Sequence, residues 1–351
     1  MLWWDAVLLL SGGLAILTTV LPLWKTDLWW VRVCEFPRIQ IAFVAALVLT
    51  ALVVTGAYGA SWGAPLGIAL ALAIAWQASW IWRYLPGARR QVERSRRPAS
   101  DPARLALFTA NVLEPNRDVE GLVAIIREAD PDVVLTAEVD DWWCERLCAA
   151  LTRAYPHQVL RPLSNTYGLA LFSRLPLIGA EVRCLIEDGV PSIRTGVELP
   201  SGDVIDVHCI HPKPPSIGQD TGHRDAELVL VAREVKARGR PAIVMGDMND
   251  VAWSHTTLML QRIGGLVDPR RGRGFYNTYP ARWPGMRWPL DYIFHSVHFR
   301  LVHMRVLGRF GSDHLPLVAV LSYEPDGAGG QKEPQPGTAD LELARERTEA
   351  E

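Results

Sequence analysis

The stretch Gly311-Ser312-Asp313-His314-Leu315-Pro316 decides the fold when it is read with Gly246-Asp247-Met248-Asn249, which follows an apolar run of strand type. Asn111, Glu138 and His211 lie upstream at comparable places, directly after short Val-, Ile- and Leu-rich runs. Loops at strand ends form the sites of layered folds, so polar side chains repeated at these positions are expected to meet. The pattern indicates a single site built for phosphate chemistry.

The first 83 residues are more apolar than the rest of the chain and predict an all-α transmembrane region of about three helices. Residues 6–24, 39–58 and 64–82 contain no charged side chain, and we place the spans at about 4–24, 39–58 and 64–82. About 20 helical residues cross a hydrocarbon core of ~30 Å. A cleaved signal peptide is the alternative for the first segment, and buried helices of a soluble core are the alternative for all three.

Tryptophans stand where interfacial aromatic belts would lie: Trp3, Trp4, Trp24, Trp29 and Trp30. Cations predict the orientation, because cytoplasmic loops retain Lys and Arg. Basic residues occur between the first two spans and after the third, whereas 59–63 has none. We therefore expect the N-terminus outside and the remainder in the cytoplasm, at a bacterial-type inner or plasma membrane. With a different number of spans, the C-terminal domain would be periplasmic or extracellular.

Residues 104–323 predict an α/β (α+β) four-layer sandwich, with two packed mixed β-sheets flanked by helices. Short apolar runs predict strands at 105–110, 133–136, 169–172, 204–210, 242–245, 292–294 and 317–321. Helical spacing occurs over 118–129, 142–154, 221–238 and 254–263. Residues 84–103 are interpreted as a basic linker, and 324–351, poor in large apolar side chains, as a disordered tail.

The polar residues at the strand ends have the chemistry of a magnesium site. Mg²⁺ prefers hard oxygen ligands, so Glu138 and Asp313 are the predicted ligands, with Asn111 beside them and Mn²⁺ as a possible substitute. Asp247 can hold and deprotonate the attacking water. The remaining predicted catalytic residues are donors and orienting groups around the phosphate: His211, Asn249, Asp291 and His314.

These motifs resemble those of the endonuclease/exonuclease/phosphatase superfamily, which includes deoxyribonuclease-I-like nucleases, abasic-site endonucleases, inositol polyphosphate 5-phosphatases and neutral sphingomyelinases. The resemblance covers about 104–323. It rests on a strand ending in Asn111, on Pro131 to Glu138, on Ile210-His211-Pro212, on residues 246–249 and 291–293, and on Ser312-Asp313-His314.

The resemblance implies a metal-dependent phosphoesterase with roles for individual residues. Glu138 would bind Mg²⁺ with Asn111 and Asp313 near it, and Asp247 would activate water. Asn249 and His211 would contact the phosphate, and Asp291 would pair with His314. Val139 departs from the polar residue that many nucleases have after this glutamate, and Met248 replaces a common aromatic residue.

The substrate depends on loops rather than on the fold. Residues 270–289 mix cations and aromatic rings, and Arg282, Arg287 and Trp288 are candidate substrate contacts. The alternative is a solvated loop whose tryptophan is anchored on the core. We expect nominally an endonuclease or exonuclease acting on nucleic acid, although a net charge of −2 excludes a uniformly basic nucleic-acid-binding surface.

Two other functions stay open at this point. A phospholipid phosphodiesterase or phosphatase would use the membrane anchor to hold its site near headgroups. A catalytically silent membrane scaffold would keep the fold for binding alone. The expected partners are therefore a nucleic-acid or phospholipid substrate and membrane lipid, and the sequence identifies no protein partner.

Overall fold

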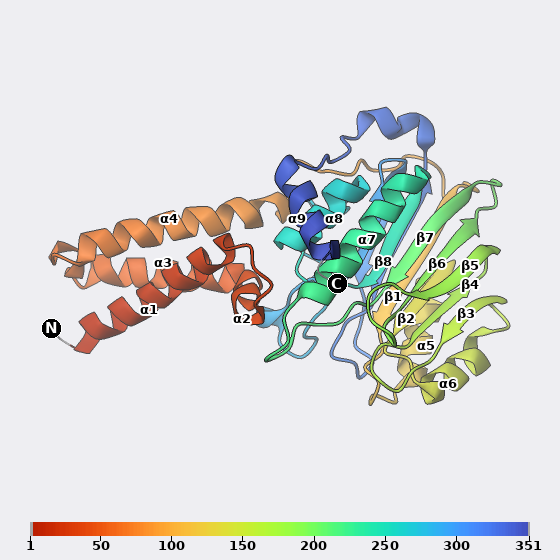
Figure 1. The fold of residues 1–351 in the computed structure, drawn as a ribbon, viewed down its shortest axis with the longest axis horizontal. Helices are drawn as coiled ribbons and strands as arrows, with labels where there is room; N and C mark the ends of the chain where they lie inside the picture. Colours follow the sequence, from red (N-terminus) through yellow and green to blue (C-terminus); the bar gives the residue numbers. More distant parts are fainter. Residues whose placement is uncertain (1–2, 350–351) are drawn as a thin grey trace.

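The computed structural model describes residues 3–349, in which a bundle of long helices projects from a layered α/β domain (Figure 1). The bundle consists of α1 (Trp3–Val20), α3 (Arg38–Val54) and α4 (Gly63–Ile81), with 3₁₀ turns at Leu21–Leu23, Ala57–Gly59 and Trp82–Tyr84. Between α1 and α3, the short α2 (Trp29–Arg32) and a 3₁₀ turn, Val33–Glu35, lie at the end of the bundle next to the α/β domain.

The bundle has the composition of a membrane region. Leu8, Ala45, Leu52 and Leu70 are buried among the helices, whereas many other leucines, valines and tryptophans face outward. Two helices, Trp3–Leu23 and Gly63–Tyr84, are long and apolar enough to cross a membrane. Trp29–Glu35 and Arg38–Val54 form a helix pair with a bend of 73° between them, and this pair would be a third span if it is counted as one. The chain therefore contains two or three helices that are candidate membrane spans, in line with the predicted three.

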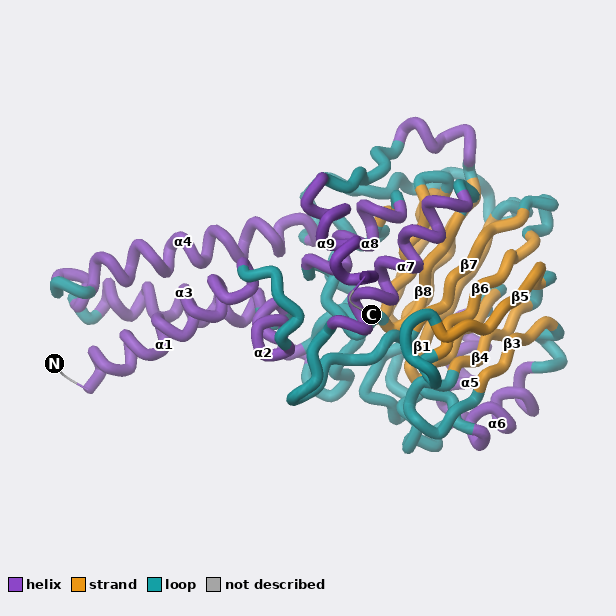
Figure 2. The backbone as a smooth tube through the Cα atoms, in the orientation of Figure 1, coloured by secondary structure: helices purple, strands orange, loops and turns teal. Residues whose placement is uncertain are grey.

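The α/β domain contains two mixed six-stranded sheets (Figure 2). In the first sheet the order is β11 (Phe299–Val306), β12 (Leu317–Tyr323), β1 (Arg104–Asn111), β2 (Val133–Ala137), β4 (Leu169–Ser173) and β3 (His157–Arg161). In the second it is β5 (Leu177–Cys184), β6 (Pro191–Glu198), β7 (Val204–Ile210), β8 (Ala242–Asp247), β10 (Asp291–Ser296) and β9 (Leu266–Val267).

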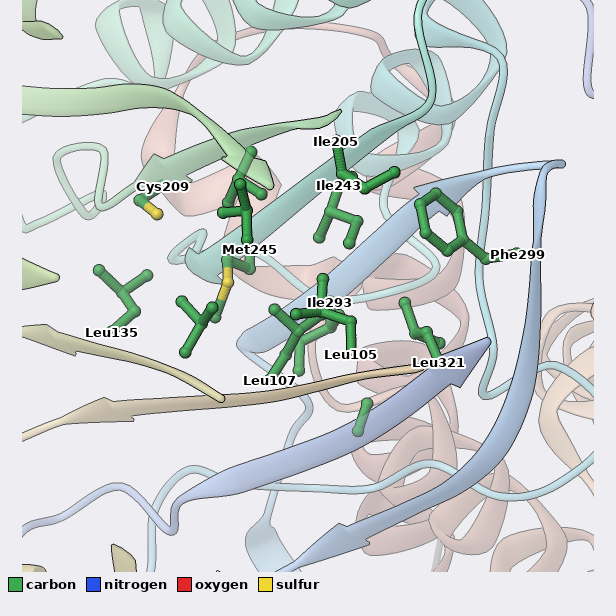
Figure 3. Packing of buried hydrophobic residues seen from close by; sticks show 14 of the residues in the cluster. Leu105, Leu107, Leu135, Ile205, Cys209, Ile243, Met245, Ile293, Phe299 and Leu321 are labelled. Carbon is green, nitrogen blue, oxygen red and sulfur yellow. The ribbon is translucent and has the colours of Figure 1, made fainter. Parts of the chain in front are cut away.

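Side-chain alternation along the central strands produces the layers. In β1, Leu105 and Leu107 point into the core between the sheets, whereas Phe108 points to the opposite face. Figure 3 shows this inter-sheet core, where Met245 of β8 and Ile293 of β10 approach the residues of β1. Because both faces of these strands are buried, their sequences read as continuous apolar runs.

Helices cover the outer face of each sheet and complete the four predicted layers. The first sheet is covered by α5 (Val119–Ala129) and α6 (Asp141–Leu151), and the second by α7 (Gly222–Arg238) and α8 (His255–Gly264). The side chains of Asp118 and Asp140 accept hydrogen bonds from Gly121 N at 2.9 Å and Trp143 N at 2.8 Å. Such N-caps fix where α5 and α6 begin.

The prediction of a disordered tail is wrong for the part that the structure describes. A 3₁₀ segment, Pro325–Gly330, is followed by the helix α9 (Thr338–Glu349), which packs on α7 and α8. Ala344 is buried, and Asp340 accepts two hydrogen bonds from Arg262 at 2.7 and 2.6 Å. Few apolar side chains, Leu343 and Ala344, pack on the core, and ion pairs supply other contacts, so the sequence lacks the apolar periodicity that predicts a packed helix. Residues 350 and 351 lie outside the described part.

The basic linker at 84–103 runs along the α/β domain and contributes to its core. Tyr84 O–H donates to Ala252 O at 2.7 Å, and Val92 is buried between the sheets. Ser95 N donates to Leu301 O at 2.9 Å, which ties the linker to β11. The bundle and the α/β domain are thus joined by packed rather than extended chain.

Candidate active site

Strand topology brings the predicted site residues to one edge of the sandwich. β1 runs parallel to β2, and β7 runs parallel to β8, so the ends of these strands reach the same edge. β10 and β12 run in the opposite direction and therefore start there. Asp247, the last residue of β8, is paired in register with Asp291, the first residue of β10.

Asp247 lies at the centre of the site and is 1 % exposed. Its Oδ1 accepts a hydrogen bond from Asn249 N at 2.9 Å, and its Oδ2 accepts one from Asn111 Nδ2 at 3.2 Å. The Nε2 atoms of His211 and His314 lie 3.8 and 3.5 Å from the same Oδ2. Burial raises the pKa of Asp247, although the neighbouring His314 opposes the shift. The carboxylate is therefore fixed by donors on several sides.

Backbone conformation around the site is specialised. Gly246 has φ of 135°, and a Cβ at this position would lie 2.0 Å from Ile210 O, so only glycine allows β8 to approach β7 this closely. Glu138 and Asn249 adopt left-handed φ values of 61° and 50°, which are uncommon for residues other than glycine. Such conformations concentrate at functional sites, where surrounding contacts hold them.

Asp291 and His314 form a buried carboxylate–imidazole pair, as predicted. His314 Nδ1 lies 2.8 Å from Asp291 Oδ2, and the ring directs Nε2 toward Asp247. Burial alone would lower the pKa of His314, but the carboxylates of Asp247 and Asp291 outweigh it and raise this pKa to about 10. The imidazolium can therefore donate a proton or a hydrogen bond at Nε2 at neutral pH.

Glu138 and Asn111 form the part of the site suited to a metal ion. Asn111 Nδ2 donates to Glu138 Oε1 at 2.7 Å, and Glu114 N donates to Oε2 at 3.2 Å. Burial raises the pKa of Glu138, and these two hydrogen bonds oppose the shift. Asp313 lines the same cavity as Glu138. These oxygen donors fit a hard divalent cation such as Mg²⁺.

A second group of potential metal ligands includes the Asp291–His314 pair. One ligand atom each of Asp247, Asp291 and His314 lie within 4.8 Å of one another. However, His314 Nδ1 is already hydrogen-bonded to Asp291, the arrangement that orients a catalytic imidazole. Glu138 with its neighbours and the Asp291–His314 pair are therefore two separate parts of the candidate site.

The sequence profile of the Endonuclease/Exonuclease/phosphatase family matches residues 108–314. This range includes all of the candidate active-site residues. The chain belongs to this family. Members of the family are hydrolases of phosphate ester bonds that depend on a divalent metal, and the chain is accordingly such a hydrolase. A comparison with curated protein sequences found no match.

Solved structures confirm the family fold. TDP2 from D. rerio, complexed with single-strand DNA product, is 17% identical, has a TM-score of 0.53, and covers 63% of this chain and 99% of its own. The human Nocturnin catalytic domain with bound sulfate is 18% identical, with a TM-score of 0.52 and coverages of 63% and 95%. A family protein from Bacteroides thetaiotaomicron is 18% identical, with a TM-score of 0.52 and coverages of 63% and 98%.

His211 and Asn249 flank the central carboxylate of the family site. His211 is 2% exposed, and burial lowers its pKa, so the neutral imidazole is favoured. Asn249 Nδ2 donates to Pro212 O at 3.0 Å, which fixes the side chain beside His211. Both predicted phosphate contacts therefore lie next to Asp247.

Positioning residues that the sequence did not single out complete the site. Ser312 Oγ donates to Asn111 O at 2.8 Å and accepts from His314 N at 3.0 Å, so it joins β1 to the loop that carries His314. The ring of Tyr279 lies 4.8 Å from that of His314. Ser312 belongs to the motif Ser312-Asp313-His314, and this membership is the only feature of the sequence that points to it. Tyr279 lies in the loop at 270–289, and its position beside His314 depends on how that loop folds.

The loop at 270–289 is partly structural. Arg270 is buried, pairs with Asp268 at 2.9 Å and stacks over Tyr292, so it is not available to substrate. Arg287 donates to the carbonyls of Pro280 and Ala281. Of the predicted substrate contacts, Trp288 packs on Phe36 with ring centroids 5.9 Å apart, and Arg282 is exposed. Their roles toward a substrate stay predictions.

Proposed function

We propose that the protein is a membrane-anchored, Mg²⁺-dependent phosphodiesterase in which Asp247 activates the attacking water. The observation that carries the proposal is the position of Asp247 Oδ2, close to Asn111 Nδ2, His211 Nε2 and His314 Nε2. A carboxylate held by donors in this way is positioned to orient a water and accept its proton. The proposal places the active site on the cytoplasmic face, as the distribution of cations predicts.

The other residues would stabilise the charge that develops on the phosphate. His314 Nε2 and His211 can donate hydrogen bonds to its oxygens, and Asn249 can do so without adding negative charge. Asp291 would hold His314 in the required orientation. A Mg²⁺ ion held by Glu138, Asn111 and Asp313 would supply Lewis-acid stabilisation of phosphate oxygens, and Mn²⁺ would be a substitute.

The nominal substrate is nucleic acid, and a phospholipid is the alternative. Support for nucleic acid is limited to a shared fold with TDP2, which was solved with a single-strand DNA product. A silent scaffold is disfavoured because every predicted site residue is present and the central ones are in mutual contact.

The test uses the full chain in detergent, with the soluble chromogenic diester bis(p-nitrophenyl) phosphate and Mg²⁺. Asp247→Asn should lower kcat by about 10²- to 10⁴-fold, because a general base contributes on this order. Asp326→Asn removes the same charge from an exposed position and serves as the matched control. Excess EDTA should abolish turnover, and added Mg²⁺ or Mn²⁺ should restore it. Retained turnover in Asp247→Asn or in EDTA would overturn the proposal.

A further inference from the structure

One cavity of about 410 Å³ is lined both by proposed site residues and by the segment that joins the first two bundle helices. Glu138, Asn249, Asp313 and His314 contribute to its polar lining. Much of the remaining lining is an apolar wall that includes Trp29, Val33, Phe36, Ile217 and Leu290. A substrate in this cavity therefore meets both polar site residues and hydrocarbon-like side chains.

This lining is unsuited to an extended polyanion. Among the described residues, neither Lys nor Arg contributes to the lining of the cavity. Proteins that bind single-stranded nucleic acid combine cationic grooves that follow the phosphates with aromatic stacking. Two cations in the neighbouring segments are paired: Lys213 lies 2.8 Å from Glu187, and Arg32 contacts buried carboxylates. The chemistry of the wall favours a ligand with one phosphoester and an apolar remainder.

The apolar wall is held firmly by the α/β domain. Trp253 Nε1 donates to Glu35 O at 2.7 Å, and the guanidinium of Arg32 lies 3.6 Å from both Asp225 and Asp250. Buried charge-assisted contacts of this kind impose a defined geometry. The segment around α2 is therefore a fixed part of the active site.

The same wall continues onto a loop that reaches outward beside the bundle. Trp29 N donates to Asp220 Oδ1 at 3.1 Å, and Ile217 in this loop is 88% exposed. Gln40 in the first turn of α3 donates to Gly285 O at 3.0 Å, so the loop carrying the exposed Trp283 also lies beside the bundle.

These apolar side chains lie where the membrane surface is expected. α1 ends, α3 begins and α4 ends on the side of the α/β domain, and α2 lies at that end (Figure 1). Exposed tryptophans are enriched at the membrane–water interface, and Trp24 and Trp30 are 58% and 42% exposed here. A cavity with its apolar wall at this level can receive a molecule whose chains stay in the bilayer.

We propose that the substrate is a lipid phosphodiester, which presents its headgroup to Asp247 while its apolar part rests against α2 and Ile217. This inference rests on the proposed phosphodiesterase function and favours its lipid alternative over the nominal nucleic-acid substrate. In the reaction, the hydroxyl of water joins phosphorus, one P–O bond to an alcohol breaks, and the remaining proton of water goes to the departing alcohol oxygen. The products are a phosphomonoester and an alcohol.

The test reconstitutes the full chain with Mg²⁺ in vesicles of phosphatidylethanolamine and phosphatidylglycerol, with phosphomonoester release followed by ³¹P NMR. Bis(p-nitrophenyl) phosphate and single-stranded DNA are assayed in parallel. Ile217→Ser and Val33→Ser should each lower lipid turnover about tenfold, because burial of a large aliphatic side chain contributes on this order to binding. Lipid turnover by each variant is divided by its turnover of the soluble diester, so that a general loss of activity is separated from a loss of lipid binding.

Ile178→Ser is the matched control, since Ile178 is 47% exposed on β5, away from the cavity. Lipid turnover that is reduced by the two wall substitutions and not by the control supports the inference. Hydrolysis of the soluble diester or DNA without lipid hydrolysis would overturn it and leave the proposed function standing. Wall variants with unchanged lipid turnover would also overturn it. Failure to hydrolyse any of the three diesters would overturn both proposals.

Discussion

Replacing Arg32 with Met should destabilise the junction between the helical bundle and the α/β domain. The guanidinium lies 3.1 Å from Glu35 and 3.6 Å from both Asp225 and Asp250, and it donates to Thr256 Oγ1 at 2.8 Å. The Arg32 side chain is 6% exposed, and the three carboxylates are at most 4% exposed. Methionine fills a similar volume but leaves this acidic cluster short of one cation.

The size of the expected destabilisation follows from the burial of the three carboxylates that surround Arg32. Arg224 still contacts Asp225 at 2.8 Å and Asp250 at 3.4 Å in the variant, so Glu35 loses the most compensation. Removing one partner of a buried ion pair costs about 3–5 kcal/mol. For a domain of 150–250 residues, 1 kcal/mol lowers Tm by about 2–4 °C, so Arg32→Met should lower Tm by about 6–20 °C.

The assay is thermal unfolding of the detergent-solubilised full chain, followed by tryptophan fluorescence. Arg345→Met is the control, because Arg345 is 74% exposed in its pair with Glu349 and an exposed pair contributes about 0–1 kcal/mol. A decrease in Tm for Arg32→Met no larger than that of the control would refute the reasoning, since it would mean that the junction does not depend on this cation.

Three further predictions concern other groups. Asp291→Asn removes the carboxylate beside His314 Nδ1 and should lower kcat about 10²-fold or more with little change in KM, measured on the soluble diester. Burial raises the pKa of Glu227 to about 8, above its ordinary 4.5. Between these two pH values the folded state keeps a proton that the unfolded chain has lost. Stability should therefore fall by about 5 kcal/mol as pH rises from 4.5 to 8, and Glu227→Gln should abolish this slope in denaturation at pH 5 and pH 9. Asp340→Asn should weaken the bond to Arg262 and speed proteolytic removal of α9 without changing turnover.

The sequence was sufficient to predict the central strands and the clustering of the candidate site residues. β1, β2, β7 and β8 have both faces buried, so their apolar runs were unmistakable. Asp247 and Asp291 belong to different motifs, and strand register alone brings them opposite each other. That adjacency could be anticipated from positions at strand ends.

Other strands and the apolar wall could not be predicted from local patterns. β5 is largely exposed, and β6 contains Pro, Ser, Thr and Gly, so neither shows the alternation typical of a half-buried strand. Arg32 was only one of the basic residues between the first two predicted spans, because three of its four partners, Asp225, Asp250 and Thr256, are more than 190 residues away in sequence. The role of α2 in the cavity depends on those long-range contacts.

The ion pairs of Arg32 also constrain the order in which the protein can be made. Arg32 and its hydrogen-bond partner Thr256 are separated by 224 positions. At 5–20 residues per second, a ribosome needs roughly 10–45 s to synthesise that interval. During this time the first helices emerge, and in the proposed topology they would enter the bilayer while Arg32 and Glu35 stay in water at its surface. In the proposed topology, the anchor would therefore enter the membrane before the domain that completes the junction exists, and docking of α2 would follow insertion.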